Sequence, residues 1–506
     1  MSNYEPVIGF EVHAELATKS KIFCGCSTTP GAAANTHTCP VCLGLPGALP
    51  VFNREAQEFA LKVALACHCK ISSPAVFERK NYYYPDLPKN YQISQKRAPF
   101  GLDGYFDIEL PDGSSKRISI VDIHLEEDAG KLAHPDDKKS AAFSLVDFNR
   151  ASVPLLEIVS GPDISSIAEA EAYMSAMRQL LQFLGVSEAR MELGQIRFEA
   201  NVSVRPVGSS ELRKRVEMKN LNSFRTVVNA SEYEIARQTE AYENGEEIVQ
   251  ETRLWDDVRG ITVSMRSKED AHDYRYFPDP DLVSMVFTEE YLASVYDSLP
   301  ELPAARRVRF IEQFGLPEYD ARLLTSEKPI ADYFEDVMKE ISHMPDFAVK
   351  ATRNSARDFA AGRAIGISPK VVSNWIIGEL LPLLKENSLQ MEDNPVTPKN
   401  FAKLMLLLEG GGINRGQARQ VFAEMFNTGG DPAEIAKARG LEQMTDTGEL
   451  ETIIDAIIAA NPDPCARFTA GEDKLLAFLV GQIMRQSKGK ANAALVNELL
   501  GKKLRP

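Results

Sequence analysis

The chain has 506 residues, with 57 lysines and arginines against 72 aspartates and glutamates, so its net charge is −15 at pH 7. This length exceeds the roughly 250–300 residues over which a single core grows, so more than one domain is expected, and the acidic balance argues against a surface that coats nucleic acid broadly. No apolar run reaches the ~20 residues that span a bilayer and no secretory signal is evident, so we expect a cytoplasmic protein without a membrane segment.

The first predicted element is a strand over residues 7–16. Apolar and polar side chains alternate there, which is the period of a strand with one buried face and one polar face. Glu11 and His13 fall on the polar face, and Glu15 follows them. Carboxylates together with an imidazole suit a hard divalent cation, so this face is a candidate metal-binding surface.

Four of the seven cysteines form two close pairs separated by a short loop rich in glycine, alanine and threonine. They are Cys24, Cys26, Cys39 and Cys42. Two such pairs on tight turns are typical of tetrahedral zinc coordination by thiolates, and four thiolates leave no open position for chemistry. The pattern therefore predicts a structural zinc, with four reduced cysteines packed among small residues as the alternative.

Residues 79–92 form the most unusual segment of the chain. It contains four tyrosines, two lysines and two prolines, and the prolines exclude a regular helix. Ordered loops that mix polar and aromatic residues usually line a site for a polar ligand. The candidate site residues in this loop are Lys80, Tyr82, Asp86 and Lys89. The alternative is an exposed loop whose tyrosines cover a neighbouring sheet.

Later segments with strand alternation add further carboxylates. Residues 118–125 lead into an acidic run that includes Glu127, residues 196–205 carry Glu199, and a segment near 214–221 carries Glu217. Several strands that each present a carboxylate predict a magnesium and phosphate site, where Arg197 and Arg205 would match phosphate oxygens. The alternative for any one strand is a solvated face of mixed charge.

The C-terminal half reads as helical from about residue 301, with proline-rich breaks near residues 278–303 and 393–398. We therefore expect three domains, at residues 1–292, 293–393 and 394–506. The end of the chain is the one locally basic region, and its candidate phosphate-contacting residues are Arg485, Lys488 and Lys490. An ordinary charged helix surface is the alternative.

Several long motifs resemble those of the B subunit of the tRNA-dependent Asp/Glu amidotransferase family, and the resemblance runs through nearly the whole chain. The motifs include Gly9-Phe10-Glu11-Val12-His13, Cys39 to Gly44, Arg79 to Pro88, His124 to Lys131, Lys219 to Phe224 and Ser264 to Leu282.

The resemblance implies a carbon–nitrogen ligase that uses glutamine as amido donor. Such a subunit uses ATP and magnesium to phosphorylate the side-chain carboxylate of Glu or Asp mischarged on tRNA, and ammonia then displaces the phosphate. A partner amidase (A) subunit supplies the ammonia and a small C subunit completes the complex. The implied fold is α+β: a cradle-shaped kinase-like domain with a mixed sheet, an all-helical domain and a small helical tail that contacts tRNA.

Matched residue by residue, the family's magnesium site falls on Glu11, His13, Glu127 and Glu217. Strand alternation from Val121 places Glu126 beside His124 instead, so the assignment of Glu127 requires a bend or bulge. The polar gate of the ammonia channel falls on the loop that contains Lys80 and Lys89.

Two positions depart from the family's strand motif, because this chain has Phe198 and Glu199 where the family has Cys and Asp. The charge is kept on a longer side chain, so the role of Glu199 stays open. Two other functions stay open as well: a non-catalytic zinc-containing tRNA-binding module, and a free-standing ammonia ligase that needs no tRNA.

Overall fold

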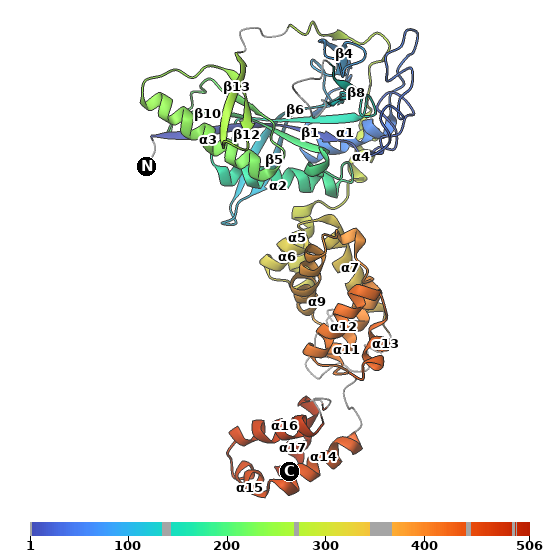
Figure 1. Ribbon diagram of the computed structural model, residues 1–506, viewed down its shortest axis with the longest axis vertical. Helices are drawn as coiled ribbons and strands as arrows, with labels where there is room; N and C mark the ends of the chain where they lie inside the picture. Colours follow the sequence, from blue (N-terminus) through green and yellow to red (C-terminus); the bar gives the residue numbers. More distant parts are fainter. Residues whose placement is uncertain are drawn as a thin grey trace. The chain divides into compact units, whose positions relative to one another are not determined.

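The computed structural model describes residues 3–133, 143–267, 273–344, 367–441, 447–487, 491 and 493–505. It divides into two compact units, Met1–Pro303 and Ala304–Pro506 (Figure 1). The first unit contains the sheets and the second is helical, so the α+β class is confirmed. In the described residues, no helix is both long enough and apolar enough to span a bilayer.

The first unit is built on a nine-stranded sheet with strand order β13-β12-β11-β10-β1-β9-β6-β5-β2. Its strands are β1 (Tyr4–Glu15), β2 (Lys70–Ile71), β5 (Gly101–Glu109), β6 (Ser115–Glu127), β9 (Pro154–Ser160), β10 (Ile196–Pro206), β11 (Val216–Lys219), β12 (Glu251–Asp256) and β13 (Ile261–Ser267). Neighbouring strands pair antiparallel except β11 and β12, which are parallel.

Two smaller sheets complete the strands of this unit. One has the order β14-β3-β4 and the other pairs β7 with β8. Their bounds are β3 (Glu78–Asn81), β4 (Tyr91–Ser94), β14 (Phe277–Pro278), β7 (Lys131–Ala133) and β8 (Leu145–Asp147). The tyrosine-rich segment is therefore the connection between β3 and β4 together with parts of both strands.

The helices of the first unit cover the apolar face of the large sheet. They are α1 (Arg54–Ala66), α2 (Ile167–Phe183), α3 (Phe224–Glu243) and α4 (Glu289–Asp297). The first three begin at side-chain caps: Asn53, Ser166 and Ser223 each accept a backbone hydrogen bond from the first turn, which satisfies a donor that would otherwise lack a partner. Figure 1 shows α2 and α3 on one side of the sheet and β4 and β8 on the other.

Strand alternation places the core of the first unit. In β1 the side chains of Phe10, Val12 and Ala14 are buried under the helices, while Glu11 and His13 lie on the opposite face. The same alternation in β10 buries Phe198 among the helices. The expected polar face of residues 7–16 and 196–205 is thus present, and one continuous side of the sheet carries the candidate site.

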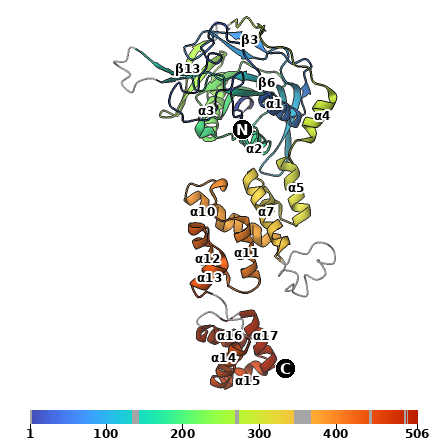
Figure 2. The ribbon, with the colours of Figure 1, turned by 90° about the vertical axis from the view of Figure 1, so that its right-hand side faces the viewer.

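The second unit consists of helices (Figure 2). They are α5 (Pro303–Phe314), α6 (Glu318–Leu324), α7 (Lys328–His343), α9 (Pro369–Trp375), α10 (Leu381–Glu386), α11 (Pro398–Glu409), α12 (Arg415–Thr428), α13 (Pro432–Ala438), α14 (Thr447–Ala460), α15 (Pro462–Thr469), α16 (Lys474–Gln486) and α17 (Ala493–Leu504). A π-helical turn at Ile376–Leu380 joins α9 to α10.

Packing within this unit bears on the expected domain boundaries. The expected boundary after residue 292 falls inside α4, and the compact units divide after Pro303. The division into three domains stays a prediction. Helix α11 packs on α7, where Phe401 contacts the ring of Tyr333, so the segment just after residue 393 shares the packing of the preceding helices. Helices α14–α17 enclose a separate core that includes Leu450, Leu479 and Leu500.

Candidate metal centres on the polar face of the sheet

Three carboxylates from three adjacent strands meet on the polar face of the large sheet. Glu11 (β1), Glu199 (β10) and Glu217 (β11) each offer an oxygen, and these atoms lie within 4.8 Å of one another. We call this group the carboxylate triad. The register explains it, because Glu11 lies opposite Glu199 and Glu217 lies opposite Asn201, one side-chain repeat further along β10. Asn201 donates a hydrogen bond of 3.0 Å to Glu11.

The triad carries more negative charge than its neighbours neutralise. Burial raises the pKa of Glu11, and the charges of Glu157, Glu199 and Glu217 raise it further. Lys219 is a cation that contacts the triad, since its ammonium lies 2.7 Å from Glu199 and 3.2 Å from Glu217. Burial alone would lower the pKa of Lys219, but these two carboxylates raise it above its usual value, so the side chain stays charged.

A second group lies beside the triad on the same face. His13, Glu126 and Glu157 offer ligand atoms within 4.8 Å of one another. Glu157 of β9 sits between two imidazoles, 3.3 Å from His13 and 3.1 Å from His124. Burial lowers the pKa of His124, but Glu157 and Asp122 outweigh this and raise it to about 10, so the buried ring is a cation at neutral pH.

Glu127 does not join either group. Its side chain is 2% exposed and accepts hydrogen bonds from Lys89, from the Ile93 backbone at 2.8 Å and from Ser152 at 2.6 Å. Glu126 instead lies with His13, as simple alternation along the strand predicts. The bulge in β6 occurs between Ile120 and Asp122, ahead of this position. The assignment of Glu127 to a magnesium site stays a prediction from the resemblance.

The tyrosine-rich loop lies next to the same polar face. The Lys80 ammonium lies 5.8 Å from the ring centre of Tyr82 and 5.3 Å from that of Tyr274. Burial would lower the pKa of Lys80, but the charge of Glu126 and its other neighbours raises it. Glu127 holds the loop in place through its ion pair with Lys89. Asp86 is half-buried, and its backbone carbonyl accepts a hydrogen bond from Gly130 at 2.9 Å.

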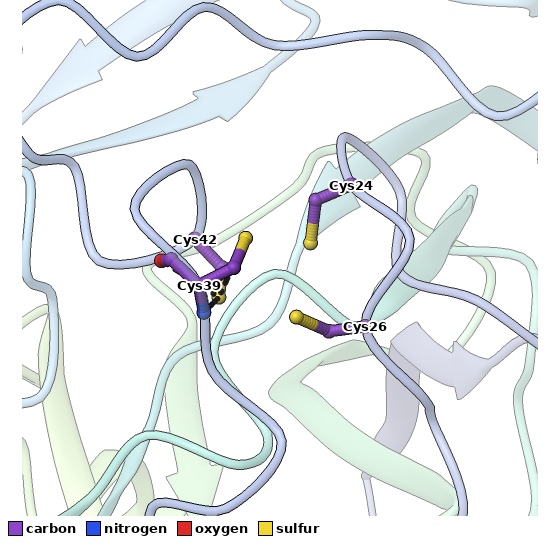
Figure 3. A group of neighbouring side chains, drawn as sticks. All are labelled: Cys24, Cys26, Cys39 and Cys42. Carbon is purple, nitrogen blue, oxygen red and sulfur yellow. Dashed lines mark hydrogen bonds between the residues drawn. The ribbon is translucent and has the colours of Figure 1, made fainter.

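The four cysteines converge as their spacing predicts (Figure 3). The sulfur atoms of Cys24, Cys26, Cys39 and Cys42 lie within 4.8 Å of one another. A hydrogen bond from the Cys24 thiol lowers the pKa of Cys42 to about 5, so one thiolate is already favoured. Four sulfurs that converge on one point fit a tetrahedral zinc. We call residues 24–42 the cysteine knuckle.

Comparison with known proteins identifies the family of this chain. A family model described as the GatB/GatE catalytic domain matches residues 6–293, and one described as the GatB domain matches residues 359–504. The chain belongs to the family of tRNA amidotransferase B subunits. A relative from Carboxydothermus hydrogenoformans, named as the B subunit of aspartyl/glutamyl-tRNA(Asn/Gln) amidotransferase, is 49% identical over 504 residues, which cover 100% of this chain and 99% of the relative.

Two further members of this family carry the same name. The one from Geotalea daltonii is 50% identical over 501 residues and the one from Brevibacillus brevis is 49% identical over 500 residues. The first alignment covers 99% of this chain and 99% of the relative, and the second covers 99% and 98%. The likeness therefore extends over both compact units.

The two arginines expected to bind phosphate are already paired in this member of the family. Arg197 lies 3.4 Å from Asp128, and Arg205 lies 2.7 Å from Glu5 on the neighbouring strand. In the C-terminal helices, Arg485 is exposed and forms no ion pair with any residue in the described ranges. Lys488 and Lys490 lie outside the described residues. The phosphate and tRNA roles of these residues stay predictions.

Sequence reasoning missed Glu157, and it noted Glu126 and Lys219 without including them among the candidate site residues. Glu157 is the single acid in the otherwise apolar run 154–159, and a lone carboxylate in a buried strand is a signal that could have singled it out. Strand alternation predicts that Glu126 lies on the same face as His124. Lys219 shares the polar face of β11 with Glu217, and only the pairing of β10 with β11 shows that it bridges two carboxylates.

Proposed function

We propose that this chain is the catalytic B subunit of an ATP-dependent tRNA amidotransferase. It phosphorylates the side-chain carboxylate of Glu-tRNA(Gln), Asp-tRNA(Asn) or both, and amidates it with ammonia delivered from glutamine by a partner amidase subunit. A small C subunit completes a cytoplasmic heterotrimer. The observation that carries this proposal is the convergence of the carboxylate triad and the His13 group on one face of the sheet, beside the tyrosine-rich loop.

The reaction converts a carboxylate oxygen, which is a poor leaving group, into part of a phosphate, which can leave. The γ-phosphoryl group of ATP moves to a carboxylate oxygen of the aminoacyl side chain and ADP leaves. Ammonia then attacks the acyl carbon, phosphate leaves with that oxygen, and the nitrogen loses a proton. Among the side chains on the polar face, charged Lys80 and Lys219 are placed to offset negative charge near the carboxylates.

The donor set fits magnesium at the triad. Carboxylate oxygens are the ligands that magnesium prefers. Burial raises the pKa of Glu11, and the charges of Glu157, Glu199 and Glu217 add to this, so a cation at the triad would favour the charged form of Glu11. Glu11, Glu199 and Glu217 would hold the ion, with His13 in the adjacent group. When bound, magnesium would neutralise negative charge on the transferring phosphoryl group.

The zinc and channel assignments have separate support. The cysteine knuckle supplies four convergent thiols and contributes no open position, so its zinc would be structural. Lys80, Tyr82, Asp86 and Lys89 line the loop where ammonia would enter, because this loop adjoins the carboxylate face. Arg485, with Lys488 and Lys490, would contact the tRNA backbone.

The test is an assay of the assembled complex with Glu-tRNA and ATP, in which hydroxylamine traps the acyl phosphate as a hydroxamate. Wild type should form ADP and hydroxamate together, and Glu11→Gln should lower both at least about 100-fold while affinity for charged tRNA is unchanged. A complex that binds charged tRNA but never forms ADP would instead be a non-catalytic binding module. Turnover of free glutamate without tRNA would identify a free-standing ligase.

A further inference from the structure

Lys21 is a buried cation beside the cysteine knuckle. The residue is 0% exposed, and lysines are almost never fully buried unless they are paired. Its ammonium donates hydrogen bonds to the carbonyl oxygens of His37 at 2.8 Å and of Phe148 at 3.3 Å. Among the residues that the structure describes, no carboxylate forms an ion pair with it. Because a buried charge is costly unless an opposite charge balances it, Lys21 requires an anion nearby.

The contacts of Lys21 place it against both halves of the knuckle. Its backbone N–H donates to the Cys26 carbonyl oxygen at 3.0 Å, in the turn of the first cysteine pair. Its ammonium contacts the carbonyl of His37, two residues before Cys39. Lys21, Cys24 and Cys39 also line one cavity of about 470 Å³. The lysine therefore joins the two segments that bring the four sulfur atoms together (Figure 3).

The groups that accept from the Lys21 ammonium are held by contacts of their own. The His37 backbone N–H donates to the side-chain oxygen of Asn149 at 2.8 Å. The Phe148 backbone N–H donates to the side-chain oxygen of Asn35, also at 2.8 Å. These hydrogen bonds connect the loop between the two cysteine pairs to the segment that follows β8. They fix the two carbonyl groups, and therefore the position of the ammonium, beside the knuckle.

The cysteine knuckle can supply the anion that Lys21 requires. Four thiolates around one zinc ion form a doubly negative group, because the zinc ion neutralises only half of their charge. Thiols that keep their protons carry no charge. Beside the hydrogen bond from Cys24, the charge of Lys21 lowers the pKa of Cys42, so the lysine acts on the cluster. The attraction between Lys21 and the knuckle is therefore strongest when zinc is bound.

We propose that Lys21 balances the charge of the zinc–thiolate group in the cysteine knuckle and thereby raises the affinity of the knuckle for zinc. Lys21 is a positioning residue and not a ligand, because an ammonium has no lone pair to donate to a metal. This inference rests on the proposed structural zinc. It adds to that site the residue that stabilises four thiolates inside the protein.

The test measures the zinc affinity of the full chain by competition with a chelator. Lys21→Met keeps most of the length of the side chain and removes its charge. The variant should bind zinc about 10–100-fold more weakly than wild type, which is the usual loss when a group that supports metal ligands is removed. Lys19→Met is the matched control, because Lys19 is exposed and only two residues away. It should leave the zinc affinity unchanged.

A second measurement separates the charge of Lys21 from its hydrogen bonds. Urea unfolding of the zinc-free chain is followed in a Trp375→Phe background, where Trp255 reports on the first unit. Without zinc the thiols can keep their protons, so Lys21→Met leaves no buried charge unbalanced. Its urea midpoint should then equal or exceed that of zinc-free wild type. If Lys21 only linked His37 to Phe148, the zinc-free variant would have the lower midpoint.

Three outcomes would overturn the inference. Equal zinc affinities of wild type and Lys21→Met would show that the thiolates do not need this charge, while the zinc site stands. Weaker zinc binding together with a lower urea midpoint of the zinc-free variant would make Lys21 a structural link between two loops. If wild type binds no zinc but forms hydroxamate normally, the proposed zinc and this inference fail together, while the proposed amidation stands.

Discussion

Glu11 of β1 lies directly opposite Glu199 of β10 in the antiparallel pairing of the two central strands. Carboxylate oxygens of the two residues lie within 4.8 Å of each other, and Glu217 adds a third. Like charges placed opposite one another on a sheet are destabilising. A fold that keeps such a pair in its centre gives up stability there, and this is typical of a functional site.

The first prediction concerns this repulsion. Glu11→Gln keeps the shape of the side chain and an oxygen that can accept from Asn201, but it removes one charge from the triad. In EDTA, the free energy of unfolding of the variant should be about 0.5–1 kcal/mol higher than that of wild type. Added magnesium should raise the free energy of unfolding of wild type and leave that of the variant unchanged. Urea unfolding with and without magnesium measures both effects.

The control for this prediction is Glu211→Gln. Glu211 is exposed and lies before β11, so removing its charge should change neither the free energy of unfolding nor the response to magnesium. A Glu11→Gln variant that is less stable than wild type in EDTA would contradict the account of the triad as a site of unrelieved repulsion.

Local sequence patterns predicted much of this face. The alternation of residues 7–16 and 196–205 identified which side of each strand is polar, because a strand has a fixed two-residue period. The spacing of the cysteines predicted their convergence. Both inferences depend on residues that are close in sequence.

Residues whose role depends on distant partners were harder to predict. Arg197 and Arg205 have the right chemistry for phosphate, but Asp128 and Glu5 neutralise them, and those pairings exist only after the strands assemble. The separation of Glu127 from Glu126 likewise depends on Lys89 and Ser152, which approach from other segments. Neither the composition of the chain nor the period of its apolar residues indicates which basic side chain pairs with which acidic one after folding.

A second prediction concerns the cysteine knuckle. Cys42→Ser should reduce the zinc content of the purified chain from about one ion per chain to almost none, since three thiolates bind zinc far more weakly than four. Elemental analysis by mass spectrometry measures this directly. Cys465→Ala is the control, because Cys465 is buried in the separate core of α14–α17 and should leave the zinc content unchanged. Equal zinc loss in both variants would exclude the knuckle as the site.

The knuckle also supports the tyrosine-rich loop. Gly44 follows the knuckle with a positive φ of 64°, and a Cβ atom there would collide with the Lys89 side chain. Because Lys89 in turn holds Glu127, chelation of zinc should loosen the loop as well as the knuckle. Hydrogen exchange of residues 79–92 should rise in wild type treated with a chelator, and unchanged protection there would separate the two features.

A third prediction concerns the buried pair of Lys89 and Glu127, whose side chains are 10% and 2% exposed. Lys89→Met leaves the Glu127 carboxylate charged and without its cation, which costs about 3–5 kcal/mol for a buried pair. Combining Lys89→Met with Glu127→Gln should recover much of that loss. Urea unfolding of the first unit measures it, in a Trp375→Phe background where Trp255 is the remaining tryptophan. A loss below about 1 kcal/mol for the single variant would show that solvent reaches the pair.

The last prediction concerns the acid stability of the helical unit. Arg306 is 7% exposed and pairs with Asp332 at 2.6 Å and with Glu335, both on α7. Burial would raise the pKa values of these two carboxyls, but their ion pairs outweigh it. Lys328 and Arg306 lower the pKa of Asp332 below its usual value of 3.8. Arg309 and Arg306 lower the pKa of Glu335 below its usual value of 4.5. The ion pairs therefore stabilise the protein fully at a pH above the pKa values that the two carboxyls have in the unfolded chain. This stabilisation is lost as the pH falls through the lower pKa values that they have in the folded protein.

This sign gives a test in a Trp255→Phe background, where Trp375 reports on the second unit. The free energy of unfolding should be constant near pH 6 and should fall as the pH is lowered below the usual carboxyl values of 4.5 and 3.8. Arg306→Leu should be less stable near pH 6 and should lose less stability on acidification, because its carboxyls no longer have depressed pKa values. Lys339→Leu, which removes a cation from α7 outside these pairs, should keep the wild-type slope. Parallel pH profiles for wild type and Arg306→Leu would show that Arg306 does not set the acid response of this unit.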